Sequence, residues 1–109
     1  MEFQVVLVTA PDLTEATKLA HSAIEAELIA CANIVPSITS IYRWEGKVQQ
    51  DSECMIIFKT TKASLTDLEE LILREHPYDT PEFVALTPTT VAERYGTWML
   101  DSIKPRTRK

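Results

Sequence analysis

Glycine is scarce in this chain, which has only Gly46 and Gly96 among its 109 residues. Two isolated glycines exclude the glycine-rich loops that hold phosphate groups in dinucleotide-binding and P-loop proteins. The sequence also lacks the Gly-x-Ser-x-Gly elbow of serine hydrolases and the His-Glu-x-x-His helix of zinc proteases. Its two cysteines, Cys31 and Cys54, match no zinc or redox spacing. We therefore expect a protein that is not an enzyme and that requires no cofactor.

The chain also has few positively charged residues. The chain has 11 Lys and Arg residues against 16 Asp and Glu residues, which gives a net charge of -5. Proteins that hold nucleic acid through its phosphates need a basic surface, so we expect no nucleic-acid partner. One basic cluster stands in the C-terminal tail, and we interpret it as a solvated end. Its residues are Lys104, Arg106, Arg108 and Lys109.

Long hydrophobic runs are absent, so no segment of the sequence predicts a membrane span. The first four residues, Met-Glu-Phe-Gln, lack the charged start of a signal peptide. We expect a cytoplasmic protein that has no membrane partner and keeps both thiols reduced. The length and even composition predict a single domain over residues 1–109.

Strand and helix periods alternate along the chain. Five β-rich runs predict strands at residues 3–9, 30–35, 38–44, 47–61 and 81–87. The run at 3–9 is apolar on both sides of the pleat, which indicates a central strand. Pro36 cannot donate to a strand ladder, so a bulge or an edge position is expected there.

Three amphipathic segments predict helices. The first begins with a capping pair, Asp12 and Glu15, and ends near residue 28 or 29. The second begins with the same spacing at Ser64 and Asp67 and ends before the His-Pro pair at residues 76 and 77. The third carries an apolar stripe made of Val91, Tyr95, Trp98, Met99 and Ile103. The resulting order, β-α-β-β-α-β plus a C-terminal helix, predicts an α+β fold of the ferredoxin-like sandwich type.

The central hairpin is the most informative feature of the pattern. A Glu-Gly pair at residues 45 and 46 predicts a two-residue turn that pairs Trp44 with Lys47. Each arm then runs for about a dozen residues, on the order of 40 Å, which is more than two helices can cover. Its tip nevertheless carries Ile41, Tyr42 and Trp44. Either the ribbon bends back onto its own domain or it lies across neighbouring subunits, and we favour self-association.

The same register separates the two cysteines. It places Cys54 opposite Ser37 and Cys31 opposite Thr60, so the sulfurs are too far apart for a disulfide. We interpret both residues as structural thiols.

Metal binding is the chemical option that the residue types leave open. His21 lies among small residues in the middle of the first predicted helix, and we interpret it as a solvated or packed side chain. His76 stands in a stretch, residues 75–82, that contains two prolines, an aromatic residue and three acids. An imidazole near carboxylates suits Cu(II) or Zn(II). The alternative is structural, with His76 capping a backbone group.

Two long segments resemble the signature of the CutA family of divalent-cation tolerance proteins. One is Ala-Cys-Ala-Asn-Ile-Val-Pro at residues 30–36 together with Thr-Ser-Ile-Tyr-Arg-Trp-Glu-Gly-Lys at 39–47. The other is His-Pro-Tyr-Asp-Thr-Pro-Glu at 76–82. The short runs at 9–12 and 58–61 are also similar to the family, so the resemblance covers nearly the whole chain.

The resemblance implies a ferredoxin-like fold that assembles into a homotrimer through long strands, as in the PII signalling proteins. It also implies a cytoplasmic protein associated with tolerance of copper and other divalent cations, without a catalytic activity. Two alternative functions remain open. One is a PII-like sensor that binds a small molecule or an anion in clefts between subunits, and the other is a scaffold for interaction with another protein.

The resemblance also suggests where metal would bind. Copper ligands proposed in some family members are a cysteine before the Thr-Ala-Pro turn and two adjacent histidines before Pro-Tyr. The corresponding positions in this chain are Val8, Glu75 and His76. With the thiolate and one imidazole missing, we expect weak binding of Cu(II) or another divalent cation at Glu75 and His76.

A cleft between subunits is the second site that the resemblance implies. The residues implied to line this cleft are His76, which is also the candidate metal ligand, and Tyr42, Trp44, Lys59, Tyr78 and Glu82. A buried lysine at position 59 would need a carboxylate or an anion as its partner. The alternative, which we favour, is that these residues simply build the trimer interface.

Overall fold

The computed structural model describes residues 3–103. The predicted solvated tail, with Lys104, Arg106, Arg108 and Lys109, lies outside the described residues. The elements are β1 (Phe3–Ala10), α1 (Leu13–Glu25), β2 (Cys31–Trp44), β3 (Lys47–Thr61), η1 (Lys62–Ser64), α2 (Leu65–Glu75), β4 (Val84–Leu86) and α3 (Glu93–Ser102). This order confirms the predicted α+β, ferredoxin-like arrangement with its additional C-terminal helix.

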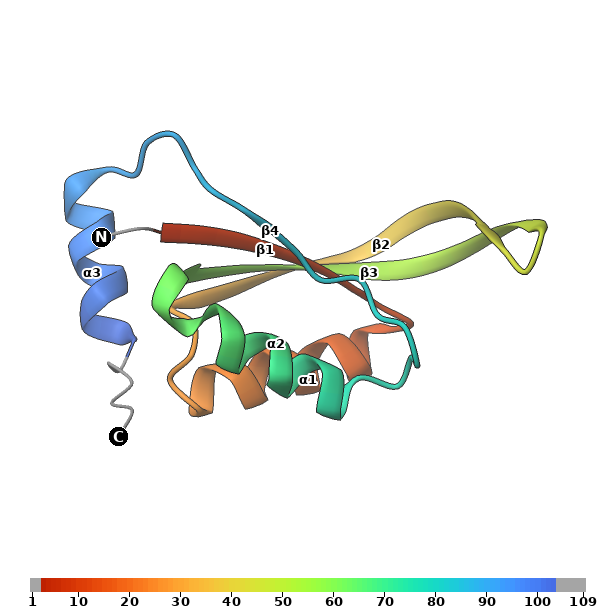
Figure 1. The fold of residues 1–109 in the computed structure, drawn as a ribbon, viewed down its shortest axis with the longest axis horizontal. Coiled ribbons are helices and arrows are strands. Elements are labelled where there is room, and N and C mark those ends of the chain that lie inside the picture. The colour runs from red at the N-terminus through yellow and green to blue at the C-terminus, as the bar shows by residue number, and fades with distance from the viewer. Residues whose placement is uncertain (1–2, 104–109) are drawn as a thin grey trace.

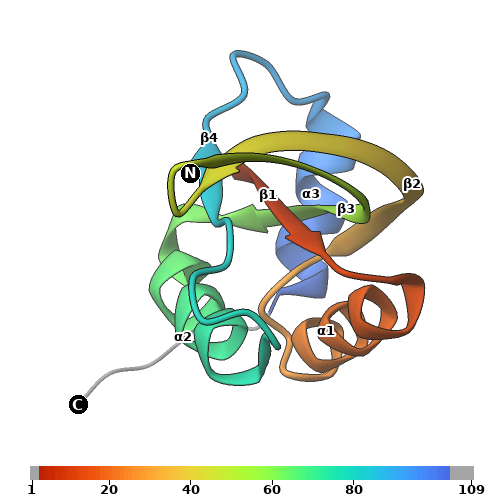
Figure 2. The same ribbon diagram turned by 90° about the vertical axis from the view of Figure 1, so that its right-hand side faces the viewer.

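The strands form one antiparallel sheet in the order β2-β3-β1-β4. Helices α1 and α2 lie side by side against one face of this sheet (Figure 1 and Figure 2). Helix α3 lies at the end of the sheet that is farthest from the β2–β3 turn (Figure 1). Strand β1 pairs with β3 over its whole length and with β4 through three residues. The prediction that the first strand is central is therefore confirmed.

Alternate residues of β1 and β3 point toward the helices and form the core. Val6, Val8, Ile56 and Phe58 are completely buried. The helices supply the apolar partners Ala16, Leu19, Ala23, Leu68, Leu71 and Ile72. Burying one large apolar side chain in this way stabilises the fold by roughly 1.5–3 kcal/mol. The core thus fixes β1 and the inner half of β3, from which the functional region extends.

Helix α1 begins as the sequence predicts but ends earlier. The side chain of Asp12 accepts a hydrogen bond of 2.8 Å from the backbone N–H of Glu15, which confirms the predicted cap. The helix ends at residue 25 instead of near 28 or 29, because Glu27 adopts a left-handed backbone conformation with φ 58°. The amide of Leu28 then bonds to the carbonyl of Ala23 and closes the final turn.

One predicted cap and one predicted strand boundary are wrong, although α2 begins directly after Ser64 as expected. The side chain of Ser64 does not cap α2, since this residue ends the short helix η1 and its hydroxyl accepts a bond from Thr61. Strand β4 covers only Val84–Leu86 instead of residues 81–87. Pro81 has no N–H to donate to a ladder, and Phe83 packs against the hydrophobic core.

The β2–β3 hairpin extends well beyond the two helices (Figure 1). Its turn residues, Glu45 and Gly46, both have positive φ, 52° and 79°, which matches the twist of the two strands. Trp44 pairs with Lys47 as predicted, and the pairing continues without interruption to Ile38. The molecule measures 44 Å along its longest axis, to which the hairpin contributes the outer part (Figure 1).

A β-bulge at Pro36 confirms the predicted irregularity and changes the inner pairing by one residue. Cys31 pairs with Lys59, and the prediction that it faces Thr60 is wrong, because two residues of β2 oppose the single residue Cys54 at the bulge. The thiol of Cys54 donates to the carbonyl of Pro36 at 3.1 Å. Both cysteines are free.

The left-handed residue that ends α1 provides a test of this description. We expect Glu27→Gly to stabilise the protein by about 0.5–1 kcal/mol, because glycine reaches positive φ without the steric cost of a Cβ atom. The free energy of unfolding in urea measures the change. The control, Lys18→Gly, changes an exposed residue in the interior of α1 and should instead destabilise the helix by about 0.5–1 kcal/mol. Equal destabilisation by both substitutions would contradict the assigned helix end.

Candidate functional site

A pocket of about 700 Å³ opens between the outer part of the hairpin and the loop that follows α2. Both strands of the hairpin and the loop at residues 77–82 contribute to its wall. The polar and aromatic residues that define its chemistry are Tyr42, Trp44, Glu53, Tyr78, Asp79 and Glu82. Four of the predicted cleft residues, all except Lys59 and His76, therefore lie together in a single chain.

Two tyrosine hydroxyls along this wall donate to carboxylates of β3. The hydroxyl of Tyr42 donates to Asp51 at 2.5 Å, and that of Tyr78 donates to Glu53 at 2.7 Å. The bond to Asp51 is the main reason that the pKa of Tyr42 is raised. The pKa of Tyr78 is raised well above the ordinary value, mainly by partial burial and secondly by the bond to Glu53. Both phenols therefore stay protonated and hold the loop and the strands together.

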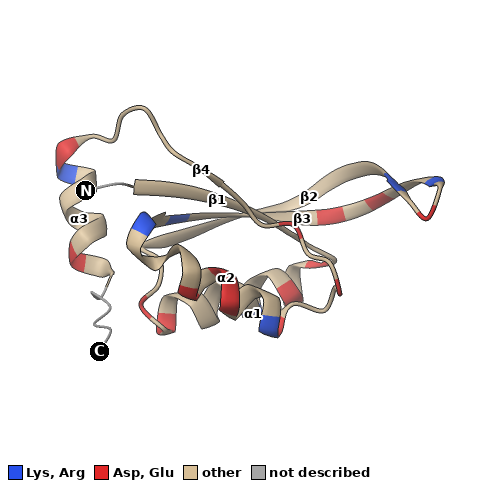
Figure 3. Ribbon diagram, in the orientation of Figure 1, with Lys and Arg blue, Asp and Glu red and all other residues tan. Residues whose placement is uncertain are grey.

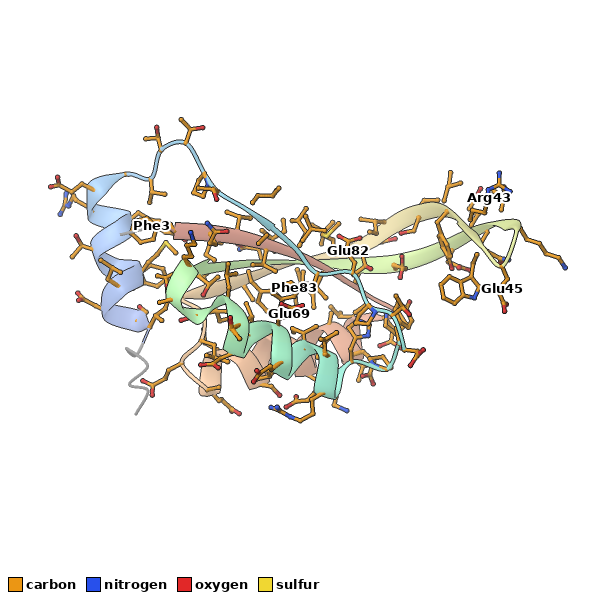
Figure 4. The ribbon with its side chains drawn as sticks, viewed as in Figure 1. Phe3, Arg43, Glu45, Glu69, Glu82 and Phe83 are labelled. Carbon is orange, nitrogen blue, oxygen red and sulfur yellow. The ribbon has the colours of Figure 1, made fainter. Side chains whose placement is uncertain are left out.

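The pocket carries negative charge. Partial burial and the nearby charge of Glu53 raise the pKa of Glu82, whose position on the loop is labelled in Figure 4. Asp79 adds a third carboxylate. Among the described residues that line the pocket, none is Lys or Arg. Acidic positions also mark the outer part of β3 in Figure 3.

His76 holds the start of the loop in place. Its Nε2 lies 2.7 Å from the carbonyl oxygen of Thr9, and its Nδ1 accepts a 3.0 Å bond from the backbone N–H of Tyr78. Because a carbonyl can only accept, Nε2 carries the proton in this contact, and Nδ1 offers its lone pair to the amide. The imidazole also packs on the Tyr78 ring at 4.8 Å and is buried. This geometry fits the structural alternative, in which His76 caps backbone groups.

The other predicted metal residue, Glu75, ends α2 and lies 3.8 Å from the guanidinium of Arg74. Neither Glu75 nor His76 lines the pocket. His21 is exposed on α1, and Val8 is buried in the core. Within residues 3–103, no group of three or more His, Cys, Asp or Glu side chains is arranged to hold a metal ion.

Lys59 lies apart from the other predicted cleft residues. It is on the inner part of β3, paired with Cys31 and Val5, and its ammonium group donates to the side-chain oxygen of Asn33. The side chain is half-buried and does not line the pocket. Its partner within the chain is therefore an amide oxygen, not a carboxylate.

Two functional residues, Asp51 and Glu53, were not identified from the sequence. The hairpin register contains a signal for Asp51, because this residue pairs with Ser40 and so lies diagonally across from Tyr42. Glu53 meets Tyr78 only because the loop folds back onto β3, and no local pattern indicates that contact.

The role of His76 can be tested by its removal. We expect His76→Ala to destabilise the fold by about 1–3 kcal/mol, because the substitution leaves the Thr9 carbonyl and the Tyr78 amide without their partner. Urea unfolding measures the loss. The control, His21→Ala, changes an exposed histidine and should have an effect within about 0.5 kcal/mol. Equal stability of the two variants would contradict the proposed structural role.

The chain resembles known proteins over most of its length. It is 45% identical over 100 residues to "Protein CutA, chloroplastic" of Arabidopsis thaliana, covering 92% of this chain and 55% of that protein, so it spans about half of that relative. It is 40% identical over 99 residues to "Divalent-cation tolerance protein CutA" of Thermus thermophilus, covering 91% of this chain and 96% of the relative. The name of the Thermus thermophilus relative describes tolerance of divalent cations, and neither name describes a catalysed reaction.

Solved structures confirm the fold. The crystal structure of CutA1 from Oryza sativa superposes with a TM-score of 0.92 at 41% identity and covers 95% of each chain. The sequence model of the family described as "CutA1 divalent ion tolerance protein" matches residues 4–102. Together with the relatives above, this match shows that the chain belongs to the CutA1 divalent ion tolerance protein family.

Proposed function

We propose that the chain is a non-catalytic divalent-cation tolerance protein that works as a homotrimer in the cytoplasm. The observation that carries this proposal is the family match over residues 4–102, to which the relative from Thermus thermophilus adds the name of a divalent-cation tolerance protein. The site that this fold offers in the present chain is the pocket between the hairpin and the adjoining loop.

The homotrimer is supported by what the hairpin exposes. Ile41 is 67% exposed, Val48 64% and Trp44 53%, and all three lie on the arm that extends beyond the helices. Strand β2 is also an edge of the sheet, so its outer backbone groups have no partner strand among residues 3–103. Sister chains laid against this arm would bury the apolar residues and cover the edge.

The same assembly accounts for the predicted intersubunit cleft. Tyr42, Trp44, Tyr78 and Glu82 belong to the pocket beside the arm, and Lys59 lies farther along β3. A neighbouring chain that lies along β3 would border both regions. Lys59 then contributes to the cleft from the subunit interface.

Weak metal binding at Glu75 and His76 is the second part of the proposal. The Glu75 carboxylate is accessible, and the Nδ1 lone pair of His76 becomes available only when the Tyr78 amide is displaced. A divalent cation such as Cu(II) must therefore compete with an existing hydrogen bond, which keeps its affinity low. No cofactor is needed for the fold or for this role.

The cytoplasmic location is supported by the free thiols and by the family resemblance. In residues 3–103, no helix has the length and apolar character needed to cross a bilayer. The name of the Arabidopsis thaliana relative places that protein in the chloroplast. Relatives therefore differ in compartment, and we propose the cytoplasm for this chain alone.

The trimer proposal predicts that one substitution on the arm separates the subunits. The wild-type chain should sediment at three times its mass of 12.3 kDa. Ile41→Glu should give monomers at micromolar concentration, because it places a charge in the contact. Sedimentation velocity measures the mass. The control, Leu73→Glu, changes an equally apolar residue that is 52% exposed on α2 and should leave the trimer intact. A wild-type chain that sediments as a monomer would contradict the trimer proposal.

The metal proposal predicts a weak, localised site. Isothermal titration with Cu(II) should give a Kd on the order of 1 mM, about -4 kcal/mol. Glu75→Gln removes one ligand charge and should weaken binding by about threefold or more. The control Glu69→Gln removes the same charge from a position outside the site and should leave the Kd unchanged. Equal binding by both variants would place the copper elsewhere.

A further inference from the structure

All of the charged side chains that line the pocket beside the hairpin are acidic. Its charged lining residues are the carboxylates of Glu53, Asp79 and Glu82. The hydroxyl protons of Tyr42 and Tyr78 are already donated to Asp51 and Glu53. These walls therefore favour a ligand that carries positive charge, and an anion would meet repulsion.

The aromatic lining narrows the choice of cation. The rings of Tyr42, Trp44 and Tyr78 contribute to the wall, and the negative face of such rings attracts organic ammonium groups. The volume of about 700 Å³ is that of a small-molecule site and far exceeds a single ion. In the described part of the chain, the carboxylates are also not gathered into a three-ligand metal cluster.

We propose that this pocket binds a small organic cation, a primary amine or a diamine, with ammonium groups held by the carboxylates and carbon chain packed on the aromatic rings. The inference goes beyond the proposed function. It rests on that function only in requiring that the pocket stays open when the subunits assemble.

A bound ammonium group would also relieve an existing repulsion. Glu82 lies close to Glu53, and its pKa is raised by burial and by that neighbouring charge. A cation between them favours the ionised form of Glu82. Binding in mildly acidic solution should therefore release protons, which titrations in two buffers of different ionisation enthalpy detect.

The experiment compares three probes that share a four-carbon chain and differ in charge. Isothermal titration of the assembled protein with 1,4-diaminobutane should give saturable binding, and raising the salt concentration should weaken it. The neutral 1,4-butanediol and the dianion succinate should not bind measurably. Saturable binding of succinate, or of butanediol as well as the diamine, would overturn the assignment.

Matched variants locate the binding. Glu82→Gln should weaken diamine binding by at least about tenfold, which is 1.4 kcal/mol. Trp44→Leu keeps an apolar side chain, removes the aromatic face and should also weaken binding. Glu69→Gln, on the exposed side of α2, makes the same charge change outside the pocket and should have no effect. Equal affinity in Glu82→Gln and Glu69→Gln would overturn the pocket assignment.

The oligomeric state is measured separately on the same samples. A diamine that binds to a monomeric protein would support the pocket and contradict the trimer. A trimer that binds no diamine would overturn the pocket alone. Cu(II) is also titrated in competition with the diamine. If Cu(II) displaces the diamine from the wild-type protein and no longer binds in Glu82→Gln, the pocket is a metal site and the proposal of an organic cation is overturned.

Discussion

The antiparallel ladder between β2 and β3 is the constraint on which the rest of the structure depends. Its inner part lies over α1 and α2, where Ile56 and Phe58 are buried, and its outer part carries the exposed residues Ile41 and Trp44. Backbone hydrogen bonds hold both parts in one continuous register apart from the Pro36 bulge. The core therefore positions residues that lie well outside it.

His76 connects this ladder to the pocket. Through its two ring nitrogens it ties the end of α2 to the carbonyl of Thr9 in β1 and to the amide of Tyr78. The tyrosine hydroxyl then reaches Glu53 on β3. His76, which the sequence suggests as a metal ligand beside carboxylates, also fixes the direction of the loop, because both of its ring nitrogens bond to backbone groups.

The negative charge of the pocket decides between an anion and a cation as its ligand. An anion is held best where a cation lies in the wall, and within one chain the lysine expected to supply it lies outside the pocket and donates to Asn33. The carboxylates of Glu53 and Glu82 instead line the pocket together with aromatic rings. Negative charge beside aromatic faces favours a positively charged organic ligand over an anion or a bare metal ion.

The sequence by itself determined the features that depend on neighbouring residues. The Asp12 cap, the Glu45-Gly46 turn and the Pro36 bulge each arise from the chemistry of a few adjacent positions. The sequence did not predict that α1 ends at Glu25, because the positive φ of Glu27 that stops the helix is rare for glutamate. Only the tertiary structure decided the bonds of His76 to Thr9 and of Tyr78 to Glu53. These partners are 67 and 25 residues apart, and they meet because helix packing sets where the loop crosses the sheet.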